Sequence, residues 1–439
     1  MWRSNLTERY DAIIVGAGII GCSIGYQLAK FGWRTINIDK MPTSGQGSTS
    51  NSLAIVRTHY STLEGSALAW EGYHCWNNWR HYLGSNRSNN IARFIKTGAL
   101  VIQTENNNKL SKQIALSKQL KIPFEEWSSL EIGKHFPLWD LRSYGPPILS
   151  DNARFGIPTA ETIHGGVFFP KAGYCNDPRL ATQNIQRATE LAGGKFRFKS
   201  EVSKIRKSNN RVLGITLSDG TIIDAPVIVN AAGPYSQILN QLAGIEQSNS
   251  ITTRVVRHEA LYLKLPSSCE HHADSIITYD ADIGSYIRPD QDGSVFVGSQ
   301  GTSFDDYNSV DPDNFEENIG SLGDEPIYRL GQRIPELGIP NRIRGIVGLW
   351  DITEDWIPIY DCSDLNGFYL AIGTSGNQFK TAPVVGELMA SLILACESGH
   401  NHDTEPLEFV LRRTGSSIQL DFFSRNRTVN NSSSFSVLG

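Results

Sequence analysis

Three glycines near the start of the chain carry the spacing of a dinucleotide-binding turn. Gly16, Gly18 and Gly21 form a GxGxxG pattern between an apolar run, YDAIIV, and a segment with helical spacing. The first glycine allows a tight turn, the second lets the backbone approach a pyrophosphate, and the third allows close helix–strand packing. The helix N-terminus offers unpaired N–H groups to the phosphates. Asp39 follows 23 residues after Gly16, where an acid hydrogen-bonds a ribose hydroxyl.

The elements that must position these glycines lie in residues 10–40. YDAIIVG and WRTINID are β-branched runs typical of strands, and GIIGCSIGYQLAKFG between them predicts a helix. A nicotinamide-binding domain would continue with further strand–helix units, whereas this chain departs after the second strand. Apolar strands return much later, in VIVNAAG at 227–233 and GFYLAIG at 367–373. This discontinuous arrangement favours FAD as the dinucleotide.

The rest of the chain predicts a second domain. Residues 251–300 alternate in short runs such as ALYLKL and SVFVG, which is typical of an antiparallel sheet. We therefore expect an α/β flavoprotein with a discontinuous Rossmann-like FAD-binding domain and an antiparallel-sheet substrate domain of α+β type. The predicted FAD-binding parts are 1–94, 161–248 and 342–415, the substrate parts are 95–160 and 249–341, and 416–439 is a C-terminal tail. This tail is rich in Ser and Asn and is expected to be mobile, while the insertion-like stretch 140–165 has no assigned role.

Composition excludes several other classes of protein. The 439 residues include 40 Lys and Arg against 45 Asp and Glu, so no broad basic surface for nucleic acid is expected. Six scattered cysteines without a CxxC pair predict a reduced compartment and neither a disulfide framework nor a metal site. No signal peptide and no apolar stretch of about 18 residues is found, which predicts a cytoplasmic protein without a transmembrane segment.

Together these motifs resemble the D-amino-acid-oxidase-like flavoproteins. Within them the chain is similar to the branch of sarcosine oxidase, glycine oxidase and dimethylglycine dehydrogenase, including the flavin-bearing β subunit of heterotetrameric sarcosine oxidase. The resemblance covers nearly all of residues 8–425. It rests on Gly16–Gly21, the segment GSTSNSLAIVRTHY at 47–60, Asp177-Pro178, VIVNAAGPYS, Tyr286-Ile-Arg-Pro and GTSGNQFK at 373–380.

The resemblance implies the residues that hold FAD. A loop of small polar residues after the second strand also suits a pyrophosphate chemically, because its backbone N–H groups can approach closely. An ordinary flexible Ser/Gly loop is the alternative. The implied cofactor-binding residues are Gly16, Gly18, Ile19, Ile20, Gly21, Asp39, Lys40, Gly47, Ser48, Thr49, Ser50, Val202, Ala232, Gly233, Gly373, Ser375, Gly376, Asn377, Gln378 and Lys380.

Two cations are implied to hold the substrate. Arg57 matches the residue that binds the substrate carboxylate in sarcosine oxidases, and Lys380 matches its cationic partner. Arginine forks onto a carboxylate while lysine adds a point charge, so two convergent cations indicate a small anionic amine or amino acid. For either residue alone a surface position is the commoner explanation, and Lys380 could instead contact the flavin ring.

Four further residues are candidates for the same pocket. Tyr286 matches a tyrosine that lines the substrate cavity in this family, although a core tyrosine is nearly as good an explanation. Arg288 lies two residues on, on the same face of the strand, and completes the predicted catalytic set. His59 and Trp350 border the pocket in the same interpretation, but a lone histidine is more often a packed or surface residue.

The sequence also departs from its relatives. Gly348 stands where monomeric sarcosine oxidase has its thioether-forming cysteine, and GQGSTSNS lacks the histidine that holds FAD in dimethylglycine dehydrogenase-type enzymes. We therefore expect noncovalent FAD. Phe296 stands where some oxidases have a lysine that helps to activate oxygen. Loss of that cation weakly favours a dehydrogenase that passes electrons to another carrier rather than to oxygen.

The expected reaction is oxidation of a C–N bond. Hydrogen on the carbon next to the amine nitrogen passes to flavin as a hydride equivalent, and the imine product hydrolyses in water. A flavin dehydrogenase of a 2-hydroxy acid is the nearest alternative. That reaction needs a base for the hydroxyl proton, and His59 is the candidate. An FAD-holding subunit of a larger electron-transfer complex is a third possibility, and the oligomeric state is open.

Overall fold

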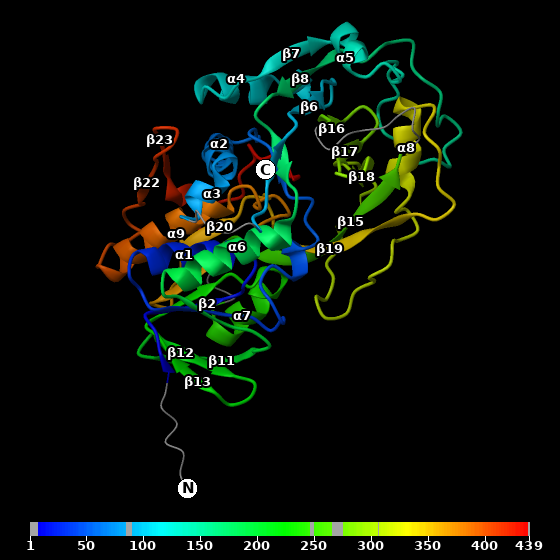
Figure 1. Cartoon of the computed structure of the whole chain (residues 1–439). Helices are drawn as coiled ribbons and strands as arrows, with labels where there is room; N and C mark the ends of the chain where they lie inside the picture. The colour runs from blue at the N-terminus through cyan, green and yellow to red at the C-terminus, as the bar shows by residue number, and fades with distance from the viewer. Residues whose placement is uncertain (1–7, 85–89, 246–249, 266–274, 306, 438–439) are drawn as a thin grey trace.

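The computed structural model describes residues 8–84, 90–245, 250–265, 275–305 and 307–437. Within these ranges two large sheets organise the chain, and Figure 1 shows them side by side. The first has six strands, in the order β10 (Lys195–Arg197), β3 (Thr35–Ile38), β2 (Ala12–Val15), β14 (Val227–Asn230), β21 (Phe368–Ile372) and β20 (Ile359–Cys362). All neighbours are parallel except β20 and β21. The predicted return of distant strands to one sheet is confirmed.

This six-stranded sheet is covered on both faces because its strands are apolar on both. Ile14 packs toward the helices, whereas its neighbour Ile13 packs toward a second, smaller sheet. In Figure 1 helices α1, α6 and α9 lie on one side and the small sheet on the other. The covering elements are α1 (Ile19–Lys30), α6 (Pro178–Leu191), α9 (Ala382–Glu397), α2 (Leu63–Asn77), α3 (Trp79–Tyr82) and, on the other face, α7 (Ser236–Ala243), β1 (Glu8–Arg9), β11 (Val202–Ser208), β12 (Arg211–Leu217) and β13 (Ile222–Asp224).

Helix α6 begins directly after Asp177. The Asp177 side chain caps it by accepting a hydrogen bond from the backbone N–H of Leu180 at 2.8 Å, and Pro178 occupies its first turn.

The second large sheet has eight strands and is mostly antiparallel. Its order is β19 (Arg344–Thr353), β15 (Thr253–Lys264), β18 (Ser294–Ser299), β17 (Ser285–Pro289), β16 (Ile277–Asp280), β6 (Ala99–Ile102), β8 (Gly165–Phe169) and β7 (Glu125–Ser128). The helices of this region are α4 (Ser111–Gln119), α5 (Ser129–His135) and α8 (Glu325–Arg333). The antiparallel sheet predicted for 251–300 is therefore present, although β16 and β6 run parallel.

A short three-stranded sheet and a hairpin complete the strands. They are β4 (Ile55–Val56), β9 (Gly173–Cys175) and β5 (Phe94–Lys96), and β22 (Glu408–Leu411) with β23 (Ser416–Gln419). Within the described ranges, every helix falls short of the length and apolar character that a membrane span requires.

Two sequence-based domain assignments differ from the structure. Strand β8 was expected in the dinucleotide domain, as was β19, yet both pair within the eight-stranded sheet. The sequence of such a hydrophobic strand looks the same in either sheet. Only the strands with which it pairs show to which sheet it belongs. The stretch 140–165 packs at the end of the same sheet, where the Asp282 carboxylate accepts hydrogen bonds from the Ser143 hydroxyl at 2.6 Å and the Tyr144 N–H at 2.8 Å.

Residues 416–437 are packed rather than mobile. The guanidinium of Arg425 is fully buried and pairs with Asp361 at 3.1 Å, Asp364 at 2.6 Å and Asp403 at 2.9 Å. Asp361, Cys362 and Asp403 lie close enough together to share an ion, but the guanidinium already neutralises the two carboxylates. Cys269 lies outside the described residues.

Candidate active site

A long groove runs over the carboxyl ends of the parallel strands. It has a volume of about 470 Å³ and meets the N-terminus of α1. Ligands of doubly wound sheets bind in this position. Of the predicted cofactor-binding residues, those that line the groove are Gly16, Gly18, Ile19, Ile20, Asp39, Lys40, Gly47, Ser48, Thr49, Ala232, Gly233, Gly376 and Gln378.

The glycine turn at the head of the groove admits no side chain. Gly16 has φ +116°, and a Cβ there would lie 2.2 Å from the carbonyl oxygen of Ala231. A Cβ at Gly21 would lie 2.2 Å from the carbonyl oxygen of Gly16, so the third glycine lets α1 pack on the turn. The Thr49 hydroxyl accepts a hydrogen bond from the Ile19 N–H at 3.2 Å, which ties the 47–49 turn to the helix N-terminus.

Asp39 closes the other end of this turn. Its carboxylate accepts hydrogen bonds from the N–H of Ala17 at 2.7 Å and of Met41 at 2.8 Å. Burial raises the pKa of this carboxyl group, and the two N–H donors oppose the rise. Beside it, the Lys40 ammonium pairs with Asp313 at 3.0 Å and lies 3.5 Å from the centre of the Tyr235 ring.

Several predicted cofactor residues do not line the groove. Gly21 and Ser50 support the turns, and Val202 lies in β11 and packs against the core. Gly373 and Ser375 shape the loop after β21, which is held by Asp351 of β19 through a 2.7 Å hydrogen bond from the Gly373 N–H. Asn377 and Lys380 line a second cavity instead.

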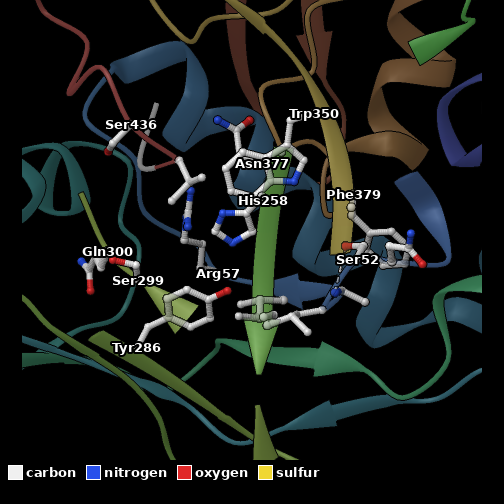
Figure 2. A pocket seen from close by; sticks show the side chains of 18 of the residues that line it. Ser52, Arg57, His258, Tyr286, Ser299, Gln300, Trp350, Asn377, Phe379 and Ser436 are labelled. Atoms are coloured by element: carbon white, nitrogen blue, oxygen red, sulfur yellow. Dashed lines mark hydrogen bonds between the residues drawn. The ribbon is translucent and has the colours of Figure 1, made fainter. Parts of the chain in front are cut away.

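This second cavity, of about 100 Å³, adjoins the groove. The two share Asn51, Ser52, Trp350, Gly376 and Phe379, so a dinucleotide lying along the groove would reach the cavity with one end. Figure 2 shows Arg57, Tyr286 and His258 directed toward this space. The cavity is therefore where a small reactant would meet the cofactor.

Arg57 is the buried cation of the cavity. It follows β4, is 4% exposed, and packs over the Tyr60 ring at 4.7 Å. Among the described residues, its Nε and Nη2 atoms have no hydrogen-bond partner. Buried charge without a partner is costly, and a carboxylate would satisfy both donors of the fork at once. The cavity wall thus contains a buried guanidinium with two nitrogens that lack a hydrogen-bond partner among the described residues, and an anion bound there stays a prediction.

Lys380 also lines the cavity, and hydrogen bonds to neighbouring residues hold its side chain and its backbone in place. Its Nζ donates to the Tyr60 hydroxyl at 2.7 Å and to the Asn377 carbonyl. Its backbone carbonyl accepts a 2.8 Å hydrogen bond from the Trp76 indole of α2. Burial, reinforced by the Arg57 charge, lowers the pKa of Lys380 well below 10.5. An anion in the cavity would favour the charged form and reverse part of this shift.

A pH dependence of anion binding follows from Lys380. The pKa of Lys380 is low in the free enzyme and is expected to be higher when a carboxylate is bound. At a pH between these two pKa values, Lys380 therefore takes up a proton when the carboxylate binds. We therefore expect the affinity for acetate to rise as the pH falls from about 10 toward the lowered pKa. Calorimetric titrations across this range check the slope. Lys380→Met should flatten it, and an unchanged slope in that variant would contradict the assignment.

Tyr286 and Arg288, although on one face of β17, have different surroundings. Tyr286 lines the cavity and crosses Gly298 of β18, where a Cβ would lie 2.4 Å from its ring. Arg288 lines neither cavity nor groove. It lies over the rings of Tyr174 at 4.4 Å and Phe296 at 4.6 Å, with Asp290 at 3.7 Å. The strand extends beyond the cavity, so a shared face did not bring Arg288 into it.

Two other expectations are also not met. His59 does not line the cavity; it stacks on Phe169 at 4.0 Å, and burial lowers its pKa well below 6.5. Phe296 lines neither the cavity nor the groove. Phe296 therefore gives no support to the expected preference for an acceptor other than oxygen.

His258 lines the cavity, although no sequence motif indicated it. This residue of β15 stacks on Trp350 at 3.8 Å and faces Gly348 in the adjoining strand. Among the described residues its Nε2 atom has no hydrogen-bond partner, and burial with nearby Arg257 lowers its pKa to about 3. The alternation of RVVRHEALYLK was a signal for its strand, but the pairing with Gly348 came from the structure.

Comparison with known proteins assigns the family. The model of FAD dependent oxidoreductases, DAO, matches residues 11–392, which include both sheets and every residue of the glycine turn. The chain belongs to this family. It is an FAD-dependent oxidoreductase, and the predicted cofactor and enzyme class are confirmed.

Relatives of this FAD-dependent oxidoreductase span nearly its whole length. Sarcosine oxidase subunit beta of Rhizobium meliloti is 25% identical over 401 residues, covering 89% of this chain and 86% of that one. Glycine oxidase of Geobacillus kaustophilus is 23% identical and covers 88% of this chain and 94% of the relative. L-proline dehydrogenase from P. horikoshii has the same fold, with a TM-score of 0.73 and 21% identity over 96% of this chain and 98% of that structure.

The residues of the groove fit FAD chemically. The turn of Gly16 and Gly18 lets a pyrophosphate reach the N-terminus of α1, where backbone N–H groups and the helix dipole favour anions. Asp39, at the end of β3, lies where a ribose hydroxyl can donate to it. When FAD is bound, its isoalloxazine ring would provide the acceptor for a hydride equivalent.

Proposed function

We propose that this enzyme oxidises the C–N bond of a small amino acid, with a secondary or N-methyl amine favoured. The carrying observation is the buried guanidinium of Arg57, whose Nε and Nη2 atoms have no partner among the described residues and which lines a small cavity adjoining the groove. The relatives named sarcosine oxidase and glycine oxidase support the same class of substrate. Noncovalent binding of FAD is part of the proposal, because Gly348 lines the cavity and no described cysteine does.

The chain's own residues contribute binding and orientation. Arg57 holds the substrate carboxylate through two parallel hydrogen bonds, and Lys380 adds positive charge on the same side. Tyr286 bounds the cavity and restricts the positions that the substrate can take. Substrate reacts as the neutral amine, and the imine hydrolyses after release, so the reaction needs positioning rather than a strong base.

Anaerobic mixing tests the reaction class. The purified holoenzyme is mixed with sarcosine, dimethylglycine, L-proline, D-amino acids and 2-hydroxy acids while the flavin absorbance is followed. Bleaching by an amine supports the proposal and identifies the substrate group, and the rate of reoxidation in air then separates an oxidase from a dehydrogenase. A yellow protein that no compound bleaches would contradict it and favour an FAD-holding subunit of a larger complex.

His258 is the observation that favours a second candidate function, the oxidation of a 2-hydroxy acid. Its Nε2 lies in the cavity wall without a partner among the described residues, where a base for the hydroxyl proton would be needed. The pKa of about 3 argues against this role, since so weak a base gains little from taking a proton.

Replacing His258 separates the two functions. If an amine is the substrate, His258→Gln should change the rate of flavin reduction by less than about tenfold. If a hydroxy acid is the substrate, loss of the general base should lower that rate roughly 100- to 10,000-fold. Stopped-flow reduction under anaerobic conditions gives the rate directly. A large loss with an amine would show that His258 has a catalytic role that positioning does not explain.

A further inference from the structure

One wall of the cavity comes from a segment far along the chain that none of the sequence motifs includes. Ser436 and Val437 line the cavity, and Figure 2 shows Ser436 at its edge. Val437, like Trp350, also packs against the apolar cluster of Val256, Ile352 and Trp356. Trp350 lines the cavity and the groove alike, so the segment touches the position where a substrate and the cofactor meet.

The chain leading to this wall is firmly anchored as far as residue 430. Arg425 is fully buried among three carboxylates, as described above. Arg427 pairs with Asp355 at 2.8 Å, and the Asp355 carboxylate also accepts a 3.2 Å hydrogen bond from the N–H of Asn430. These contacts lie outside the cavity, and they fix where the following residues begin.

Beyond Asn430, hydrogen bonds join the segment to distant parts of the chain. The Lys112 ammonium donates to the Ser432 carbonyl at 2.6 Å, and the N–H of Ser434 donates to the Ser61 hydroxyl at 3.0 Å. Ser61 lies four residues after Arg57, so this second bond attaches the segment directly beside the anion site. Residues 432–437 thus join the α4 region, the Arg57 segment and β19 across one side of the cavity.

We infer that residues 432–437 form a wall that sets the size of the substituent a substrate can carry. The inference rests on the proposed function, because it assigns the cavity to an amino acid held by Arg57. With the carboxylate fixed there, the remainder of the substrate points into the space that Val437, Tyr307 and Trp350 enclose. Val437 fills part of that space, so the site takes small amino acids and excludes branched ones.

Trimming Val437 tests this wall. In the holoenzyme, dissociation constants for acetate and trimethylacetate are measured from the perturbation of the flavin absorbance. Val437→Ala should tighten trimethylacetate relative to acetate by about tenfold, since a pocket discriminates by about this factor per methyl group or more. Phe435→Ala is the matched control, because Phe435 is 45% exposed and lines neither the cavity nor the groove. An unchanged ratio in Val437→Ala, or the same change in Phe435→Ala, would overturn the inference.

A second measurement separates this inference from the proposed function. If the unaltered holoenzyme binds neither carboxylate, the proposed function has failed. The wall is then tested by how fast a reagent in solution modifies His258. A chain ending at Asn431 keeps the Arg425 and Arg427 anchors, so it should retain its melting temperature within a few degrees. Diethylpyrocarbonate should modify His258 faster in that chain than in Phe435→Ala, as followed by mass spectrometry. An equal rate would overturn the wall even though the fold is intact.

Discussion

Arg57→Met is expected to abolish useful binding of carboxylates while leaving the protein folded. Removing one partner of a buried, hydrogen-bonded charge pair costs about 2–4 kcal/mol, which corresponds to a roughly 30- to 1,000-fold higher dissociation constant. In the free enzyme the same change removes a buried guanidinium, two nitrogens of which have no hydrogen-bond partner in the described part of the chain. We therefore expect the melting temperature of the free enzyme to stay the same or to rise. Titration with acetate and thermal unfolding measure the two effects.

Arg288→Met is the matched control for this prediction. Arg288 is also buried and lies on the strand that carries Tyr286, but it lines neither the cavity nor the groove. The variant loses the stacking of Arg288 on Tyr174 and Phe296 and its pairing with Asp290, so the melting temperature of the variant should fall. Its dissociation constant for acetate should stay within about twofold of that of the unaltered enzyme. Equal losses of binding in both variants would show that Arg57 acts through general stability and does not hold the anion.

The dinucleotide site was predictable because its determinants are local. Gly16, Gly18 and Gly21 act within six residues, and the close approaches that require glycine are made by the turn itself and by the neighbouring strand end at Ala231. Buried strands such as AIIV and VIVN are apolar on both faces, which is the pattern that a covered parallel sheet requires. The order of these strands in the sheet came from the structure.

The cavity was only partly predictable because it forms between segments that are distant in sequence. The resemblance supplied Arg57, Tyr286 and Lys380, and all three line the cavity. His258 was missed because one histidine in an alternating strand carries no local signal. Its place depends on the register of β15 against β19, which pairs it with Gly348. The expectation for His59 was wrong for the same reason, because its neighbours along the chain do not reveal that it stacks on Phe169, more than a hundred residues away in sequence.

The packed segment 424–437 shows a further limit of composition. Its Ser and Asn content is typical of a mobile tail, yet two arginines decide its structure. Arg425 and Arg427 pair with the buried carboxylates of Asp361 and Asp355, about which the local sequence says nothing. A polar segment can therefore be fixed by a few charge pairs when their partners are already buried.

Gly16→Ala is expected to yield a chain that folds but holds little FAD. The new Cβ would lie 2.2 Å from the Ala231 carbonyl oxygen at φ +116°, so the turn must open and withdraw the N–H groups of the α1 N-terminus from the pyrophosphate. Displacing such a turn costs about 1–3 kcal/mol, which is a roughly 5- to 150-fold loss of affinity for FAD. The measurement is the FAD retained per chain after gel filtration, together with the dissociation constant for added FAD.

Gly32→Ala distinguishes this effect from backbone strain alone. Gly32 also has a positive φ, +85°, but a Cβ there meets no atom within 4 Å, and it lies at the far end of α1 from the groove. It should therefore lower the melting temperature while FAD stays bound at the level of the unaltered enzyme. Full FAD content in Gly16→Ala would mean that the pyrophosphate does not approach this turn. The same loss in both variants would mean that strain in α1, rather than the clash with Ala231, governs cofactor binding.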